Sequence, residues 1–162
     1  DKALISITII NAGTAYNVID DQVTMGGTIR TFKKDTRSYI EKRLNEICKG
    51  IAEAHGAEIK IQFDLVNKYP PTINSKKESI FASNVAKDLV GEDKVITDID
   101  PSMGGEDFSY LLEEKPGSYL YLGQGDSEHK AHLHTTKYDF NDNLLPVGVN
   151  FWIELVKKYF SK

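Results

Sequence analysis

Two consecutive prolines near the middle of the chain, Pro70 and Pro71, restrict its fold more than any other feature. Proline cannot donate a backbone hydrogen bond to a β-ladder, and it disfavours the helical conformation in the residue before it. A regular element therefore has to end at Tyr69. We place a domain boundary there, and we predict one domain over residues 1–71 and another over residues 72–162.

The first domain is predicted to contain two strands, a helix and a third strand. Strands are expected over residues 4–10, 23–32 and 59–65, where β-branched or alternating apolar residues are bounded by turn residues. A helix is expected from Asp35, the predicted N-cap, to Gly56, because apolar residues recur at helical spacing. This order matches the later part of a ferredoxin-like split βαβ sandwich. Such a small set makes a thin core, so we expect the opening strand and helix to be missing or supplied by another chain.

The second predicted strand has two features that bear on function. Its adjacent glycines, Gly26 and Gly27, indicate a bulge or a close approach by backbone or ligand. Arg30 projects from the face opposite Ile29, because successive side chains alternate along a strand.

The single cysteine, Cys48, lies on the apolar face of the predicted helix, so we expect a buried and unreactive thiol. One cysteine excludes a disulfide within the chain and fits a reducing compartment, which favours a cytoplasmic protein. A net charge of −4 gives no electrostatic case for nucleic acid or an anionic membrane as partner. The longest apolar run is too short to span a membrane, and no export signal precedes it.

The second domain is predicted to alternate helices with short strands. One helix should run from a capping box at Ser75 and Glu78 to Gly91, and another should follow the loop at residues 101–108. Strands are expected over residues 94–98 and 119–122. The last helix has Pro146 in its first turn. Its expected buried stripe consists of Val149, Trp152, Ile153, Val156, Tyr159 and Phe160.

The loop at residues 101–108 and the stretch at residues 131–142 are candidates for chemistry. In the loop, Glu106 and Asp107 suit the N-terminus of a helix, whereas Gly105 and the preceding Gly104 would let backbone amides approach a ligand closely. The stretch combines two imidazoles with two carboxylates, which suits metal binding. It also suits a polar surface loop that caps the following helix, and both interpretations stay open on spacing alone.

Several separated stretches, in order along nearly the whole chain, resemble one family. They are residues 17–21, 27–32, 70–71, Asn74, 103–109, 116–117, 122–123, 133–134 and 138–142. Together they resemble the C-terminal part of the N-acyl-amino-acid amidohydrolases. These form the aminoacylase, hippurate hydrolase and auxin-conjugate hydrolase branch of the co-catalytic metallopeptidases.

The resemblance implies an α/β fold with an α+β lid. Residues 1–71 would be part of a ferredoxin-like lid that also forms a homodimer, and residues 72–162 would be the C-terminal part of an α/β catalytic domain. The complete enzyme would hold divalent metal ions, as a pair of zinc, manganese, cobalt or nickel ions.

The resemblance also assigns site residues. His134 corresponds to the last metal ligand, and Asn17, Arg30 and Gly105 correspond to substrate-binding positions. The general base and the other ligands belong to N-terminal motifs with no counterpart in this sequence, so no catalytic residue is assigned. We interpret the remaining histidines, His55, His129 and His132, as structural or solvent-facing.

The first functional hypothesis is a fragment of a metal-dependent amidohydrolase. The whole enzyme would hydrolyse the amide bond of N-acyl amino acids or small peptides, and the fragment alone would be inactive without the N-terminal half. The alternative is a non-catalytic dimerisation or binding module, because an exposed strand edge is a template for association.

Overall fold

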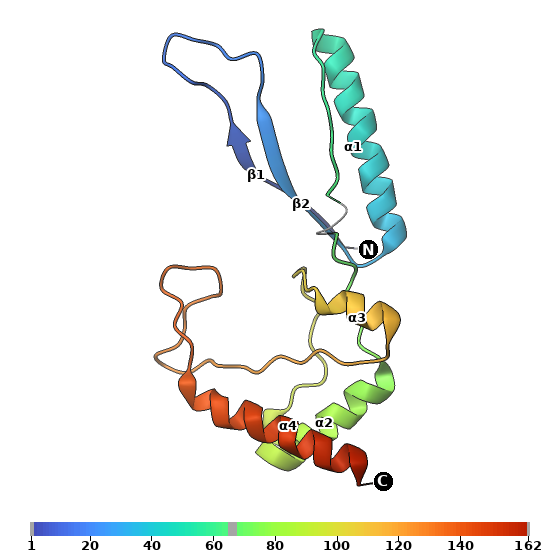
Figure 1. Cartoon of the computed structure of the whole chain (residues 1–162), viewed down its shortest axis with the longest axis vertical. Helices are drawn as coiled ribbons and strands as arrows, with labels where there is room; N and C mark the ends of the chain where they lie inside the picture. The colour runs from blue at the N-terminus through green and yellow to red at the C-terminus, as the bar shows by residue number, and fades with distance from the viewer. Residues whose placement is uncertain (1, 65–67, 162) are drawn as a thin grey trace. The chain divides into compact units, whose positions relative to one another are not determined.

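A computed structural model describes residues 2–64 and 68–161 of the chain (Figure 1). The chain divides into two units. The first contains Asp1–Thr72 and Pro101–Tyr110, and the second contains Ile73–Asp100 and Leu111–Lys162. Both helices and a small sheet are present, which confirms the predicted mixed α/β class. The assignment of residues 1–71 to a lid and of 72–162 to a catalytic domain stays a prediction.

The first unit begins with an antiparallel hairpin of β1 (Ala3–Asn11) and β2 (Thr24–Thr31). The register shifts between Ile7 and Ile9, opposite the paired glycines of β2. At Gly27 the facing backbone is so close that a Cβ atom would overlap the carbonyl oxygen of Ser6. The bulge and the close backbone approach that the two glycines predict are therefore both confirmed.

Helix α1 (Lys34–His55) follows the hairpin and contacts β2. It ends at Gly56, whose φ of 62° is the left-handed conformation that terminates many helices, as predicted. The predicted N-cap is wrong: Lys33 occupies that position, and Asp35 lies in the first turn, where its charge suits the positive end of the helix dipole. Cys48 is half-buried rather than buried, because α1 has few neighbours to cover its apolar face.

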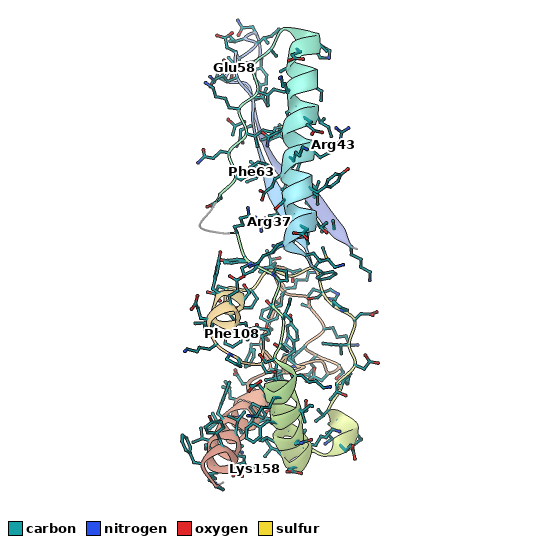
Figure 2. The ribbon with its side chains drawn as sticks, turned by 90° about the vertical axis from the view of Figure 1, so that its right-hand side faces the viewer. Arg37, Arg43, Glu58, Phe63, Phe108 and Lys158 are labelled. Carbon is teal, nitrogen blue, oxygen red and sulfur yellow. The ribbon has the colours of Figure 1, made fainter. Side chains whose placement is uncertain are left out.

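The predicted strand at residues 59–65 does not form over residues 59–64, and its last residue lies outside the described part of the chain. Part of the expected alternation is nevertheless present, since Ile61 and Phe63 are half-buried whereas Lys60 and Gln62 are exposed, although Ile59 is exposed as well. The segment runs alongside α1 and carries Phe63 on its length (Figures 1 and 2). A ladder needs a second strand, and the described sheet contains only β1 and β2.

The second unit is built on two helices, α2 (Lys76–Val90) and α4 (Leu145–Phe160), which contact each other. Ala82 and Val85 of α2 are its buried apolar residues, and the rings of Phe81 and Tyr159 pack edge to face with centroids 6.2 Å apart. Lys158 of α4, which Figure 2 labels, forms an ion pair with Asp88 of α2. Helix α2 extends to Gly91, and Pro146 lies in the first turn of α4, as predicted.

The predicted capping box at the start of α2 is wrong. The Ser75 side chain makes no capping bond; its Oγ instead accepts a hydrogen bond from the amide of Gly117, at 3.2 Å. The Ser75 amide in turn donates to the Gly117 carbonyl, at 2.9 Å. The Ser75 hydroxyl thus bonds to Gly117, which is distant in the sequence, rather than to the N-terminus of its own helix as the local pattern predicts.

The strands predicted over residues 94–98 and 119–122 are also wrong. The first region holds a short 3₁₀ helix, η1 (Glu92–Lys94), followed by irregular backbone. In the second region, Tyr119 bonds through its amide and carbonyl to the side-chain amide of Asn74, at 2.7 and 2.9 Å. That side chain takes the backbone groups that a neighbouring strand would otherwise pair with. Two further short helices, α3 (Phe108–Glu114) and η2 (Asp142–Leu144), complete the elements.

The stripe of α4 expected to be buried is instead exposed in this chain. Trp152 is 59% exposed and Phe160 is 77% exposed, and the other four residues of the stripe are also exposed. One packed neighbour, α2, covers only part of a helix surface. Within the described residues, no helix is both long and apolar enough to cross a membrane.

Replacing Gly27 with alanine should destabilise the hairpin by about 1–3 kcal/mol, because the new methyl group has no space beside Ser6. Gly26→Ala is the matched control, since its Cβ would meet the Ile9 side chain at an ordinary 3.5 Å. Amide hydrogen exchange in β1 and β2 measures this local opening. Equal protection in both variants would contradict the predicted crowding at Gly27.

Candidate functional site

Arg30 lies near the end of β2, where it pairs with Leu4 of β1, and its side chain is half-buried. Among the residues that the structure describes, no carboxylate pairs with its guanidinium group. Arginine presents a planar fork of donors that matches a carboxylate. An arginine at a fixed strand position without a carboxylate partner among the described residues can therefore receive an anionic ligand.

Gly105 lies directly against Arg30, within the same unit. A Cβ atom on Gly105 would overlap Nη1 of Arg30 and would lie 3.1 Å from Cδ2 of Tyr69. The guanidinium group therefore rests where only a glycine leaves room. The structure thus brings together two residues that the family resemblance assigns to substrate binding, although the chain separates them by more than seventy positions.

Two tyrosines accompany Arg30 and Gly105, and sequence reasoning missed both. Tyr69 packs edge to face against Tyr110, with ring centroids 5.9 Å apart and an interplanar angle of 71°. The Tyr69 carbonyl accepts a hydrogen bond from Arg37, at 3.5 Å. We call Arg30, Tyr69, Gly105 and Tyr110 the arginine cluster. Little in the sequence indicates this cluster, because Tyr69 is notable there only as the residue before two prolines.

Asn17 does not join the arginine cluster within this chain. It is exposed in the loop between β1 and β2, which a Thr14–Asp20 hydrogen bond of 3.1 Å spans. That loop closes the hairpin end where Asn11 pairs with Thr24. A strand rises about 3.3 Å per residue, so Arg30 lies roughly 20 Å along β2 from Thr24, at the end of the hairpin that carries the loop of Asn17.

His134 lies in the second unit, in the loop that precedes α4, and its side chain is exposed. Its φ is 64°, and among the described residues it is the one residue other than glycine whose backbone is left-handed. That conformation is uncommon for side-chain-bearing residues and often accompanies a functional position. The neighbouring turn is local: the Thr135 hydroxyl donates to the His132 carbonyl at 2.9 Å, and the Tyr138 amide donates to the Thr135 carbonyl at 3.1 Å.

Four side chains join the two ends of the loop that carries His134. Nδ1 of His129 lies 2.9 Å from both carboxylate oxygens of Asp126. Nδ2 of Asn141, a residue only 7% exposed, donates to Oδ2 of Asp126 at 3.1 Å and to the carbonyl of Gln124 at 3.3 Å. We call Gln124, Asp126, His129 and Asn141 the loop clasp. His129, interpreted from the sequence as structural or solvent-facing, pairs here with Asp126, a partner that was not foreseen.

The loop clasp has a marked electrostatic character. Hydrogen bonds from the backbone and side chain of His129 and from the backbone of Glu128 lower the pKa of Asp126 to about 2. The hydrogen bond to Asp126 raises the pKa of His129 above its usual value, and the charges of Asp126, Asp139 and Glu128 act in the same direction. The clasp therefore joins a carboxylate of lowered pKa to an imidazole of raised pKa and to an amide donor, and it is an ion pair when His129 is protonated.

The described residues do not form a metal site by themselves. No group of three or more His, Cys, Asp or Glu side chains able to hold an ion occurs in the described part of the chain. A catalytic ion needs about three protein ligands. Among the described residues, His134 is the side chain that the family resemblance assigns to metal binding, and no described group of three such side chains surrounds it.

The model of Peptidase family M20/M25/M40 matches residues 2–158, and the chain belongs to this family. Hippurate hydrolase from Campylobacter jejuni is 38% identical over 161 residues, which cover 99% of this chain and 41% of that protein. An IAA-amino acid hydrolase from Arabidopsis thaliana is 31% identical, covering 100% of this chain and 37% of the relative. The chain thus spans about two fifths of the length of these curated relatives.

A solved structure has a fold similar to that of this chain. The YXEP protein of Bacillus subtilis, described as a dinuclear metal-binding peptidase of family M20, matches with a TM-score of 0.72 and 30% identity. The match covers 94% of this chain and 40% of that protein. The expected similarity to amidohydrolases and metallopeptidases is therefore confirmed.

Gly105→Ala should displace the Arg30 side chain while changing the free energy of unfolding by no more than about 1 kcal/mol, because the clash involves the end of a flexible side chain. Gly104→Ala is the matched control, since its Cβ would meet only Ser102 Oγ, at 3.5 Å. The chemical shift of the Arg30 Nε–Hε group reports the displacement. Equal shifts in the two variants would show that Gly105 does not seat Arg30.

Proposed function

We propose that this chain is part of a metal-dependent amidohydrolase that cleaves the amide bond of N-acyl amino acids or small peptides. Hippurate hydrolase, the IAA-amino acid hydrolases and N-acetylcysteine deacetylase, all similar to this chain, are named for acylated amino acids. Such substrates share an amide bond and a free carboxylate, so the enzyme needs a cationic group placed for that carboxylate.

The observation that carries this proposal is the arginine cluster. Arg30 has no carboxylate partner among the described residues and rests against Gly105, with the edge of Tyr69 beside it. A guanidinium group held in this way can bind the substrate carboxylate through two parallel hydrogen bonds. The tyrosine rings add an apolar surface for the side chain or acyl group.

His134 is proposed as one metal ligand of the complete enzyme. The enzyme would bind a pair of divalent ions, and the family resemblance implies that N-terminal motifs supply the other ligands. When bound, such ions supply activated water and a Lewis acid. Asn17 is proposed as a further substrate-binding residue, and the first unit is proposed to form the homodimer, in which a second chain could bring its loop to the site.

A non-catalytic dimerisation or binding module is the second candidate function. It is favoured by the incomplete ligand set and by the exposed apolar side chains of β1, which are Leu4, Ile5, Ile7, Ile9 and Ile10. Under this proposal the chain associates through the first unit and hydrolyses nothing in any context. Arg30 would then bind no substrate carboxylate, and His134 would bind no metal ion.

Transplanting the chain distinguishes the two candidates. We expect no hydrolysis of hippurate or N-acetyl-amino acids by the isolated chain with added zinc, manganese, cobalt or nickel. A chimera in which this chain replaces the matching segment of the Campylobacter jejuni enzyme should hydrolyse them. In the chimera, His134→Ala should lower kcat/KM by more than about 100-fold. Loss of a residue that only hydrogen-bonds to a metal ligand costs about 10- to 100-fold, and loss of the ligand itself should cost more.

His132→Ala in the same chimera is the matched control, since His132 contributes only its backbone carbonyl to the turn. It should keep most of the activity. Enzyme-like turnover by the isolated chain would contradict the fragment proposal. A folded, metal-loaded chimera without turnover would favour the non-catalytic module.

A further inference from the structure

The loop that carries His134 is closed at its base by side chains rather than by regular structure. Gln124 reaches across the base: its Nε2 donates to the Asp139 carbonyl at 3.2 Å, and its Oε1 accepts from the Tyr138 hydroxyl at 3.1 Å. Asn141, on the other side, donates to the Gln124 carbonyl. The two ends of the loop are thus held together just before η2.

Asp126 links this base to the first turn of the loop. Its Oδ1 accepts from the amides of Glu128 and His129, at 2.8 and 2.7 Å, and its carboxylate pairs with the His129 ring. Its Oδ2 accepts from Asn141. One carboxylate therefore holds the start of the loop, through His129, and its end, through Asn141.

His134 lies within the closed part of the loop in a conformation that needs support. A side-chain-bearing residue with a φ of 64° is less stable than in the common regions by about 1–2 kcal/mol, so it persists only where the surrounding structure requires it. The bonds nearest His134 lie in the turn of His132, Thr135 and Tyr138. The Tyr138 hydroxyl also donates to Gln124, so this turn is connected to the base of the loop that the clasp closes.

We propose that Asp126 is the positioning residue for His134, holding its backbone in the left-handed conformation by joining His129 to Asn141. The proposal deepens the proposed function, because it concerns how the assigned ligand is presented. It does not require that a metal be bound, since the closure is formed by residues of this chain alone. Asp126 and His129 were not among the residues that the family resemblance assigned.

The clasp should depend on pH in a defined direction. The groups that face His129 are Asp126, Glu128 and Asp139, all acidic. Because the pKa of His129 is raised above 6.5, its contribution is complete below pH 6.5 and is lost as the pH rises through the raised value. Because the pKa of Asp126 is lowered to about 2 from 3.8, its contribution is present above pH 3.8 and lost as the pH falls toward 2. The clasp should be strongest between these limits.

NMR of the full 162-residue chain, without added metal, tests the proposal. The His134 backbone conformation is read from the short intraresidue HN–Hα distance that a positive φ imposes, and loop closure from hydrogen exchange of the His134 amide. Asp126→Asn should bring the His129 midpoint toward about 6.5, weaken the positive-φ signal and speed His134 exchange several-fold. Asp142→Asn, a nearby exposed carboxylate outside the clasp, is the matched control.

A second variant, His129→Gln, keeps the test informative if Asp126→Asn does not fold. It should remove the pH dependence of the His134 protection factor, which is the exchange rate relative to the unprotected amide, between pH 5 and 8, whereas His132→Gln should leave it. An unchanged His134 conformation in Asp126→Asn, or a wild-type His129 midpoint that is not raised, would overturn the proposal. Neither result would affect the loss of chimera activity in His134→Ala, so the two proposals fail separately.

Discussion

The scarcity of packed neighbours is the constraint on which the rest of this structure depends. In the described residues, β1 pairs only with β2, and α2 packs chiefly on α4. Ile40, Ala82 and Val85 are the buried apolar side chains there, and of these only Val85 is fully buried. Each helix or strand therefore has one covered face, and the apolar stripe of α4 stays exposed although its sequence pattern is that of a core helix.

Polar side chains do more of the positioning in this chain than apolar packing does. Asn74 holds Tyr119, Ser75 holds Gly117, and the loop clasp closes the loop of His134. Such bonds are directional and so select one conformation. Arg30 is held differently, by the absence of a side chain at Gly105. The candidate ligand-binding residues are thus positioned by individual side-chain contacts, which do not require a large apolar core.

The helices and the two strands of the hairpin were predictable here, whereas three further expected strands did not form in the described residues. The helix that ends at Gly56 and the one that ends at Gly91 follow from local spacing and a glycine terminus, because a helix satisfies its backbone within one segment. The strands expected at residues 59–64, 94–98 and 119–122 required partners elsewhere in the chain, which the described residues do not provide. The alternation of Ile61 and Phe63 survives because it records which side faces α1, whether or not a ladder forms.

By itself, the sequence determined the helices, the bulge at Gly26 and Gly27, and the candidate roles of Arg30, Gly105 and His134. These depend on residue type and local spacing, or on the order of motifs that mark the family. Only the tertiary structure decided that Gly105 lies against Arg30, that Ser75 serves Gly117 rather than its helix, and that Asp126 joins His129 to Asn141. Each of these contacts joins segments separated along the chain, and a local pattern has no information about which distant group arrives beside it.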